Sequence, residues 1–260
     1  HLGAVFGPVA AFVLLSIFAV NTQNPTIREY QQVFLFASVP VVLGLLVIAF
    51  LVREEPKPDA AIAAAPPNFS LKGFDSNFKR FLIVIAVFTL SNSTDAFLLL
   101  RATESGISPV ILPLLWMTLH ISKVVSSLVG GDLSDKFGRK KLIISGWLIY
   151  ALVYAGFAFV ISAWQVWALF IVYGIYFGLT EGVEKAFVAD MVPTKRRGTA
   201  YGLYNLAFGI TVFPASLLFG LVWNQFGATT AFLASGCISL LAIVMLTTVK
   251  PQDPITVVIP

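Results

Sequence analysis

Charged residues are scarce in this chain of 260 residues: Asp, Glu, Lys and Arg together make up 12% of it, whereas hydrophobic residues make up 58%. A soluble domain carries about 25% charged residues. A globule of this size also lacks the interior volume to hide so many apolar side chains from water. The composition therefore excludes an ordinary soluble globule and indicates a membrane protein.

Side chains that support catalysis or metal binding are also few, with two histidines and one cysteine, Cys237. The chain contains no Cys–His cluster and neither the H-E-x-x-H nor the G-x-S-x-G pattern of hydrolases. It has no Walker-type phosphate loop and no segment like a channel filter. We therefore expect neither an enzyme nor a channel, and we expect no cofactor and no metal.

Long apolar runs fill most of the chain. They are Leu2–Val20, Val33–Val52, Phe81–Leu100, Val110–Val129, Leu142–Ile161, Trp164–Ala189, Thr199–Val222 and Phe226–Val249. A helix needs roughly 20 apolar residues to cross a bilayer, and a helix satisfies its own backbone amides there. The runs are too long and too uniformly apolar for barrel strands. We predict an all-α polytopic membrane protein with eight transmembrane helices.

Lysine and arginine are distributed unevenly over the links between these runs. Most of the 17 cations lie in the links of one side, while the other side holds only Arg28 and Arg101. The positive-inside rule places the cation-rich side in the cytoplasm, so both ends of the chain should lie there. The net charge of +4 is spread along membrane edges and indicates no nucleic-acid partner.

One polar stretch, GGDLSDKFGRKK at residues 130–141, interrupts the apolar sequence; we call it the signature segment. Its spacing, G-x-x-x-D-(R/K)-x-G-(R/K)-(R/K), is met by Gly131, Asp135, Lys136, Gly138, Arg139 and Lys140. This spacing resembles the signature loop of the major facilitator superfamily of secondary transporters. The alternative is a solvated basic turn that only fixes the topology.

The resemblance covers essentially the whole chain and implies a twelve-helix fold. Residues 1–52 would be the last two helices of the N-terminal six-helix half, and residues 53–78 a cytoplasmic linker rich in proline and alanine. Residues 79–250 would form a complete six-helix C-terminal half, and residues 251–260 a cytoplasmic tail. The chain would then be a fragment, and four missing N-terminal helices of the same protein would be its partners.

A second motif lies in the first apolar run. Gly3, Gly7 and Pro8 resemble the G-x-x-x-G-P core of a motif found in proton-coupled antiporters of the superfamily. The family motif ends in two more glycines, where this chain has Ala11 and Phe12. A structural role is the alternative, because two glycines make a face for close helix packing and a proline bends the helix.

The resemblance also implies a cytoplasmic latch within the signature segment. Asp135 would dock near Arg197, at the start of the seventh run, while the inner face is closed. Arg139 would pair with Asp190 at the end of the sixth run. Breaking these contacts would accompany opening towards the cytoplasm, which is the population shift that alternating access needs.

Polar residues inside the apolar runs are candidates for the substrate and proton pathway. These candidates are Asn92, Asp95, His120, Lys123 and Glu181. At 1.5 Å per residue, Asp95 lies about 24 Å from the inner membrane edge and Glu181 about 13 Å from it. We expect one of these two acids to take up the proton, with His120 and Lys123 as partners in a cavity.

Purely structural roles are the alternative for the acids. Lys185 lies four residues after Glu181 and favours a helix-face ion pair. Glu184 would then join the latch, and Asp95 would cap a kink beside Asn92. The four-residue repeat of Gly174, Gly178 and Gly182 indicates a face for helix packing. Arg101 and Glu104 indicate a surface pair at the outer edge.

Together these features predict a secondary transporter that moves a small molecule by alternating access, with proton-coupled efflux as the favoured form. A proton-coupled uptake symporter of the same fold and a non-transporting membrane scaffold or sensor are the alternatives. The expected partners are membrane lipid, a small-molecule substrate and protons. The expected location is the cytoplasmic (inner) membrane of a bacterium.

Overall fold

The structure, a computed structural model, describes residues 2–53 and 70–250. The predicted linker at 53–78 is therefore described only near its two ends, and the predicted tail at 251–260 lies outside the described residues. Within the described ranges the chain is helical and contains no strand. Two compact units make up the fold: His1–Asn68 with Ile107–Met117, and Phe69–Gly106 with Thr118–Pro260, each in its described parts.

The first unit contains α1 (Leu2–Phe18) and α2 (Ile27–Leu51), which pack against each other around Leu15 and Val33. The turn between them is fixed by a capping box at the start of α2. The Glu29 carboxylate accepts the N–H of the N-cap residue Thr26 at 2.6 Å and the N–H of Val20, just after α1, at 3.0 Å, so it links the start of α2 to the end of α1.

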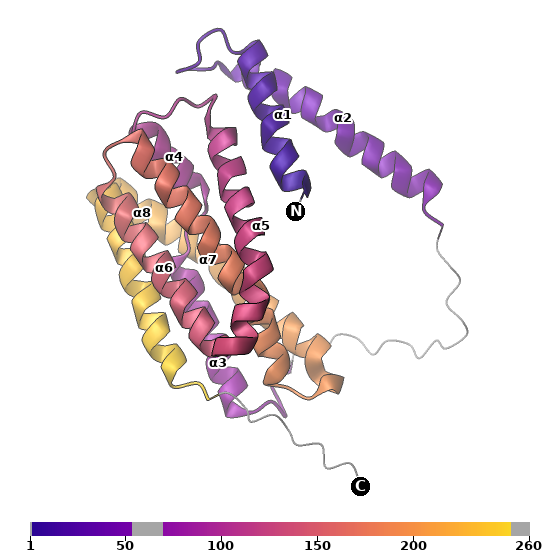
Figure 1. The fold of residues 1–260 in the computed structure, drawn as a ribbon, viewed down its shortest axis with the longest axis vertical. Coiled ribbons are helices and arrows are strands. Elements are labelled where there is room, and N and C mark those ends of the chain that lie inside the picture. Colours follow the sequence, from indigo (N-terminus) through magenta and orange to yellow (C-terminus); the bar gives the residue numbers. More distant parts are fainter. Residues whose placement is uncertain (1, 54–69, 251–260) are drawn as a thin grey trace. The chain divides into compact units, whose positions relative to one another are not determined.

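The second unit is a helical bundle. Its elements are α3 (Ser76–Ser91), α4 (Ala96–Glu104), α5 (Leu112–Phe137, from Thr118 on), α6 (Arg139–Phe159), α7 (Ala163–Asp190), the short 3₁₀ helix η1 (Thr194–Arg196) and α8 (Arg197–Thr247). Helix α6 packs against both α7 and α8, and α3 packs against α8 (Figure 1). Helix α8 thus contacts α3, α6 and α7, and α6 contributes three of the largest buried side chains of the bundle.

Aromatic rings fill the centre of this bundle. Trp147, Tyr150 and Tyr154 of α6 are fully buried, and the indole of Trp147 stacks on Phe88 of α3 with ring centres 4.0 Å apart. Since lipid is as apolar as these side chains, their association depends on close packing and on hydrogen bonds rather than on exclusion of water. The phenolic hydroxyl groups therefore need partners inside the bundle.

By length and composition, six helical segments of the described chain could cross a membrane, and α1 is a shorter apolar helix. Two features explain why this count is six and not the eight crossings that were predicted. The first run forms a helix of only 17 residues, and the last two runs form one helical segment, Thr194–Thr247, of 54 residues. At 1.5 Å per residue that segment would be about 80 Å long, more than twice the hydrocarbon thickness. It is interrupted at Gly227, whose φ of 85° is not helical.

Candidate functional site

The predicted span Phe81–Leu100 is not one continuous helix, because residues 92–95 separate α3 from α4. The break leaves backbone groups without helical partners, and neighbouring helices supply them. Tyr150 donates to the Ser91 carbonyl at 2.7 Å, and the Thr94 N–H donates to the Ser216 hydroxyl at 3.1 Å. Broken helices at membrane depth are tolerated where neighbours satisfy them in this way, and in transporters they often form binding sites.

Asp95 lies at this break, immediately before α4. Its carboxylate makes no capping bond to α4; instead, Oδ1 accepts a hydrogen bond of 3.0 Å from the Tyr173 hydroxyl of α7. The alternative in which Asp95 caps a kink is therefore wrong, although the kink itself exists. Asn92, the residue that follows α3, lines the cavity described next.

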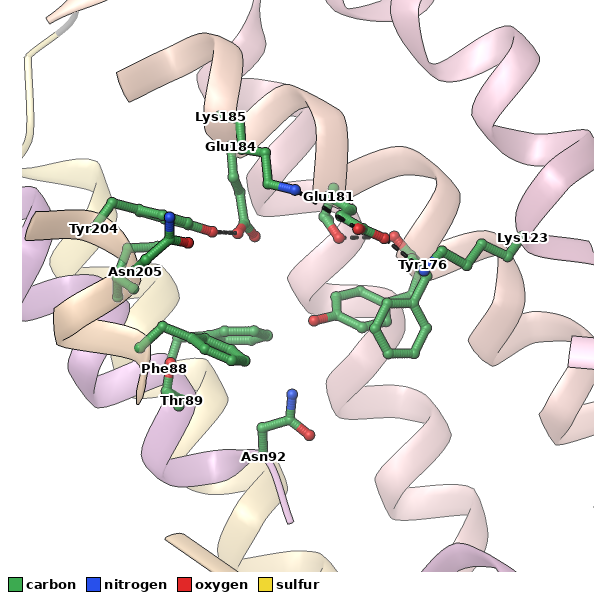
Figure 2. A pocket seen from close by; sticks show the side chains of 14 residues that line it. Phe88, Thr89, Asn92, Lys123, Tyr176, Glu181, Glu184, Lys185, Tyr204 and Asn205 are labelled. Carbon is green, nitrogen blue, oxygen red and sulfur yellow. Dashed lines mark hydrogen bonds and ion pairs between the residues drawn. The ribbon is translucent and has the colours of Figure 1, made fainter. Parts of the chain in front are cut away.

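A cavity of about 280 Å³ lies within the second unit, and residues of α3, α5, α7 and α8 line it (Figure 2). Its walls are aromatic, with Phe88 from α3, Tyr176 and Phe177 from α7, and Tyr204 and Phe208 from α8. Its charged residues are Lys123, Glu181, Glu184 and Lys185. The cavity therefore combines apolar walls with a few convergent charges, which is typical of small-molecule sites.

Three of these charges form a linked set around Glu181. Lys123 Nζ of α5 lies 2.5 Å from Glu181 Oε2, and Lys185 Nζ lies 3.7 Å from Oε1. The Lys123 side chain is 17% exposed and that of Lys185 is 52% exposed, so Lys123 is the closer and more buried partner. Lys123 Nζ also lies 4.9 Å from the centre of the Phe177 ring, a cation–π distance.

The fourth charge, Glu184, is 8% exposed and lies apart from this set. Its Oε1 accepts the indole N–H of Trp147 at 2.8 Å, and its Oε2 accepts the Tyr204 hydroxyl at 2.7 Å. Figure 2 shows Tyr204 reaching Glu184 at one side of the cavity. Glu184 thus binds Trp147 of α6 and Tyr204 of α8 and not Arg139 of the predicted latch, and its assignment to the latch stays a prediction.

The remaining predicted pathway residue, His120, lies on α5 one turn before Lys123 and does not line this cavity. The structure thus brings Asn92, Lys123 and Glu181 together around one cavity. It places Asp95 at the adjoining helix break and His120 elsewhere on α5.

The signature segment is almost entirely helical, whereas its resemblance to the family's signature loop predicted a loop. Helix α5 continues to Phe137 and α6 begins at Arg139, so Gly138 alone joins them, with a φ of 89° and a ψ of 136°. Gly131 is an ordinary helical residue of α5, and a Cβ built there would meet nothing within 4 Å. The close backbone approach in this segment occurs at the neighbouring Gly130, whose added Cβ would lie 2.7 Å from the Gly178 carbonyl oxygen of α7.

We expect a Gly138→Ala variant to lose about 1–3 kcal/mol of stability, because residues with a Cβ rarely adopt this backbone conformation. No neighbouring atom lies within 4 Å of the added Cβ, so the loss would come from the backbone alone. Thermal unfolding in detergent measures it.

Gly131→Ala is the matched control, since it should gain about 0.5–1 kcal/mol in a helix interior. Equal unfolding temperatures for the two variants would contradict the assignment of strain to Gly138.

Part of the predicted latch is present as an ion pair. Arg139 Nη1 lies 2.7 Å from Asp190 Oδ2 and also donates to the Ala186 carbonyl at 2.6 Å, so Arg139 binds the end of α7. The function of this contact as a latch stays a prediction.

Other members of the predicted latch lie apart. Asp135, Lys136 and Arg197 are exposed, and no ion pair joins Asp135 to Arg197. Lys140 takes a different role: its Nζ donates to the carbonyls of Thr247 at 2.7 Å and Val249 at 2.6 Å. A cation at the end of α8 satisfies the last carbonyls and complements the helix dipole.

The antiporter-like motif lies at the start of α1. A Cβ added at Gly3 or Gly7 would meet nothing within 4 Å, so in the described residues these glycines make no close helix contact. Pro8 lies inside α1, and the helix continues past it.

The comparison with known protein families covers nearly the whole chain. The model of the Major Facilitator Superfamily matches residues 1–180 and 81–258, two overlapping matches. The chain belongs to the major facilitator superfamily.

Individual relatives of this major facilitator protein include two uncharacterized MFS-type transporters. One, from Methanocaldococcus jannaschii, is 35% identical over 202 residues, which is 75% of this chain and 50% of the relative. The other, from Bacillus subtilis, is 33% identical over 115 residues, covering 44% of this chain and 28% of the relative. The multi-drug resistance efflux pump PmrA of Streptococcus pneumoniae is 28% identical over 125 residues, covering 48% of this chain and 31% of the relative. The chain therefore spans half or less of the length of these three relatives.

Residue-level reasoning on this major facilitator chain missed Glu184 as a cavity residue. One signal was available, because Glu184 lies three residues after Glu181 and so on the same face of α7. Its two hydrogen-bond donors could not be foreseen, since Trp147 and Tyr204 lie 37 and 20 residues away along the chain on other helices.

Proposed function

We propose that the protein is a secondary active transporter that carries a small molecule out of the cell in exchange for protons. The observation that carries this proposal is the cavity with its Lys123–Glu181–Lys185 set, in a chain of the major facilitator superfamily. Ionisable groups inside membrane helices mark substrate and proton pathways. The similarity to a multidrug efflux pump supports export over uptake.

The architecture that fits this proposal has eight crossings. They are α1, α2, the broken pair α3 and α4, α5, α6, α7, and the two parts of α8 on either side of Gly227. Residues 1–52 would then complete an N-terminal half, and residues 79–250 would form the C-terminal half. The signature segment and both ends of the chain would face the cytoplasm of a bacterial inner membrane.

Glu181 is the proposed exchange site for the proton, with Asp95 at the helix break as the second acid of the path. Protonation of Glu181 would remove the charge that holds Lys123 of α5 to α7 at 2.5 Å. Loss of that contact would loosen α5 from α7, and this is a differential interaction that proton binding can use to shift a conformational equilibrium. The Arg139–Asp190 pair at the inner ends of α6 and α7 would break in the same transition.

The test is gradient-driven transport by the product of the complete reading frame, reconstituted in vesicles of known orientation. A panel of cationic, neutral and anionic fluorescent dyes serves as substrate. We expect inverted vesicles with an acidic lumen to accumulate at least one dye, and a protonophore to abolish the accumulation.

The two alternatives give different results in the same assay. Accumulation only in right-side-out vesicles with an acidic exterior would identify an uptake symporter. An absence of gradient-dependent movement for every dye would identify a scaffold or sensor and contradict transport.

A further inference from the structure

Glu184 is a buried carboxylate that forms no ion pair within the described residues. Both of its hydrogen-bond donors in the described chain, Trp147 and Tyr204, are neutral, and no Lys, Arg or His nitrogen of residues 2–53 or 70–250 forms an ion pair with it. A carboxylate at membrane depth is costly to keep charged unless a cation or a proton neutralises it. Since Trp147 can only donate, it favours a bare oxygen at Oε1.

The cavity lysines do not fill this role, because Glu181 binds both of them. Lys123 lies 2.5 Å and Lys185 lies 3.7 Å from its two oxygens. Lys185 is also 52% exposed at its side chain. Lys185 also attracts the Glu184 carboxylate electrostatically, but its ion pair is with Glu181. The Glu184 carboxylate therefore has no ion-pair partner among the described residues, and a cation from outside the chain can supply one.

The walls around this carboxylate suit an organic cation. Phe88, Tyr176 and Phe208 line the same cavity, and the rings of Tyr176 and Phe177 lie 4.9 Å apart. The faces of aromatic rings attract cations, and Lys123 Nζ already uses Phe177 in this way. An anionic substrate would instead have to displace Glu181 from a lysine at 2.5 Å and lie beside Glu184.

We infer that the cavity binds a small organic monocation with aromatic or alkyl groups, and that the Glu184 carboxylate holds its charge. This inference rests on the proposed transport function and names its substrate class. When the cation leaves, one proton takes its place on Glu184 and neutralises it, in addition to the proton that Glu181 exchanges in the proposed transport cycle.

Several titratable groups face Glu184, so the pH dependence of binding has contributions from more than one group. Glu181, Lys185 and Tyr176 face it from α7 and Tyr204 from α8, while α6 contributes only the neutral Trp147. A pH profile of binding in the wild-type protein alone would therefore not isolate Glu184, and the comparison with a variant is required.

The probe for the first experiment is tetraphenylphosphonium, with binding measured by isothermal titration calorimetry on the purified product of the complete reading frame. We expect Glu184→Gln to weaken binding at least tenfold and to flatten its dependence on pH. Glu104→Gln, the same change in the surface pair with Arg101, is the matched control and should leave the affinity within twofold. Equal affinity for wild type and Glu184→Gln would overturn the inference.

A second measurement needs no variant and covers the case in which Glu184→Gln does not fold. A hydrophobic carbodiimide labels carboxyl groups in membrane segments, and mass spectrometry reports labelling at Glu184. We expect tetraphenylphosphonium to protect Glu184 at least fivefold, and unchanged labelling would overturn the inference.

The two proposals fail differently in these experiments. Binding at Glu184 without transport of any dye would leave the cation site standing and contradict transport. If anionic or neutral dyes are transported, and neither added tetraphenylphosphonium nor the Glu184→Gln variant changes the rate, the cation site would be overturned while the transport function would stand.

Discussion

A Gly178→Val variant is expected to lose folded protein almost completely, or to unfold at a clearly lower temperature in detergent. A Cβ added at residue 178 would lie 2.7 Å from the backbone nitrogen of Ser127 and would also contact the Ser126 side chain of α5. A backbone atom cannot rotate away as a side chain can, so α5 would have to move. Overpacking of this kind costs about 1–3 kcal/mol and sometimes more. The hydrogen bond of 3.3 Å from Ser126 to the Gly174 carbonyl, which joins the same two helices, would be strained as well.

Gly182→Val is the matched control for this prediction, because Gly182 lies one turn further along α7. A Cβ at Gly182 would meet nothing within 4 Å, so we expect its unfolding temperature to stay within a few degrees of wild type. Fluorescence-detected size-exclusion chromatography after heating measures both variants. If both valines destabilise alike, helix propensity and not the α5–α7 contact is responsible.

Gly174, Gly178 and Gly182 show what sequence periodicity can predict about helix packing and what it cannot. Their four-residue spacing predicted a small face on the sixth run, and Gly174 and Gly178 do contact α5. Gly182 has no such contact. Periodicity fixes which face of a helix a residue lies on, but it does not fix where along the helix a partner crosses. That point depends on the packing of helices distant in sequence.

The broken helix marks a second limit. The apolar run from Phe81 to Leu100 is long enough for one span, and the polar residues 92–95 were visible within it. The break is stable because Tyr150 and Ser216, from α6 and α8, satisfy the freed backbone groups. The sequence alone shows that the segment is polar. It does not show which residues of other helices will bind the free backbone groups of the break, because these residues are brought close only by the three-dimensional fold.

Family-level features were the most predictable, because they depend on composition and local spacing. The helical membrane fold and the superfamily follow from long apolar runs and from the spacing of the signature segment, and both are confirmed. The shape of that segment was not predictable from the same spacing. Its glycines indicated a turn, yet only Gly138 leaves the helical conformation.

A Lys123→Gln variant is expected to lose at least tenfold in gradient-driven transport and about 1–3 kcal/mol of stability. Removing one partner of a buried ion pair leaves the other charge uncompensated, which costs about 3–5 kcal/mol when both groups are buried. The Glu181 side chain is 45% exposed, so the expected loss is smaller here. Lys185→Gln is the comparison: its ion pair with Glu181 is longer, at 3.7 Å, and half exposed, so its loss should be below about 1 kcal/mol.

The double variant Lys123→Gln with Glu181→Gln separates stability from transport. Removing both charges abolishes the penalty of an unpaired carboxylate, so the unfolding temperature should recover most of the loss seen for Lys123→Gln alone. Transport should not recover, because the proposed proton site at Glu181 is gone. Additive losses of stability in the double variant would show that the 2.5 Å contact contributes no coupling between α5 and α7. Recovery of proton-driven transport together with stability would show that the pair only joins the two helices. The exchanged proton would then have to bind at another acid, with Glu184 in the cavity and Asp95 at the helix break as the next to test.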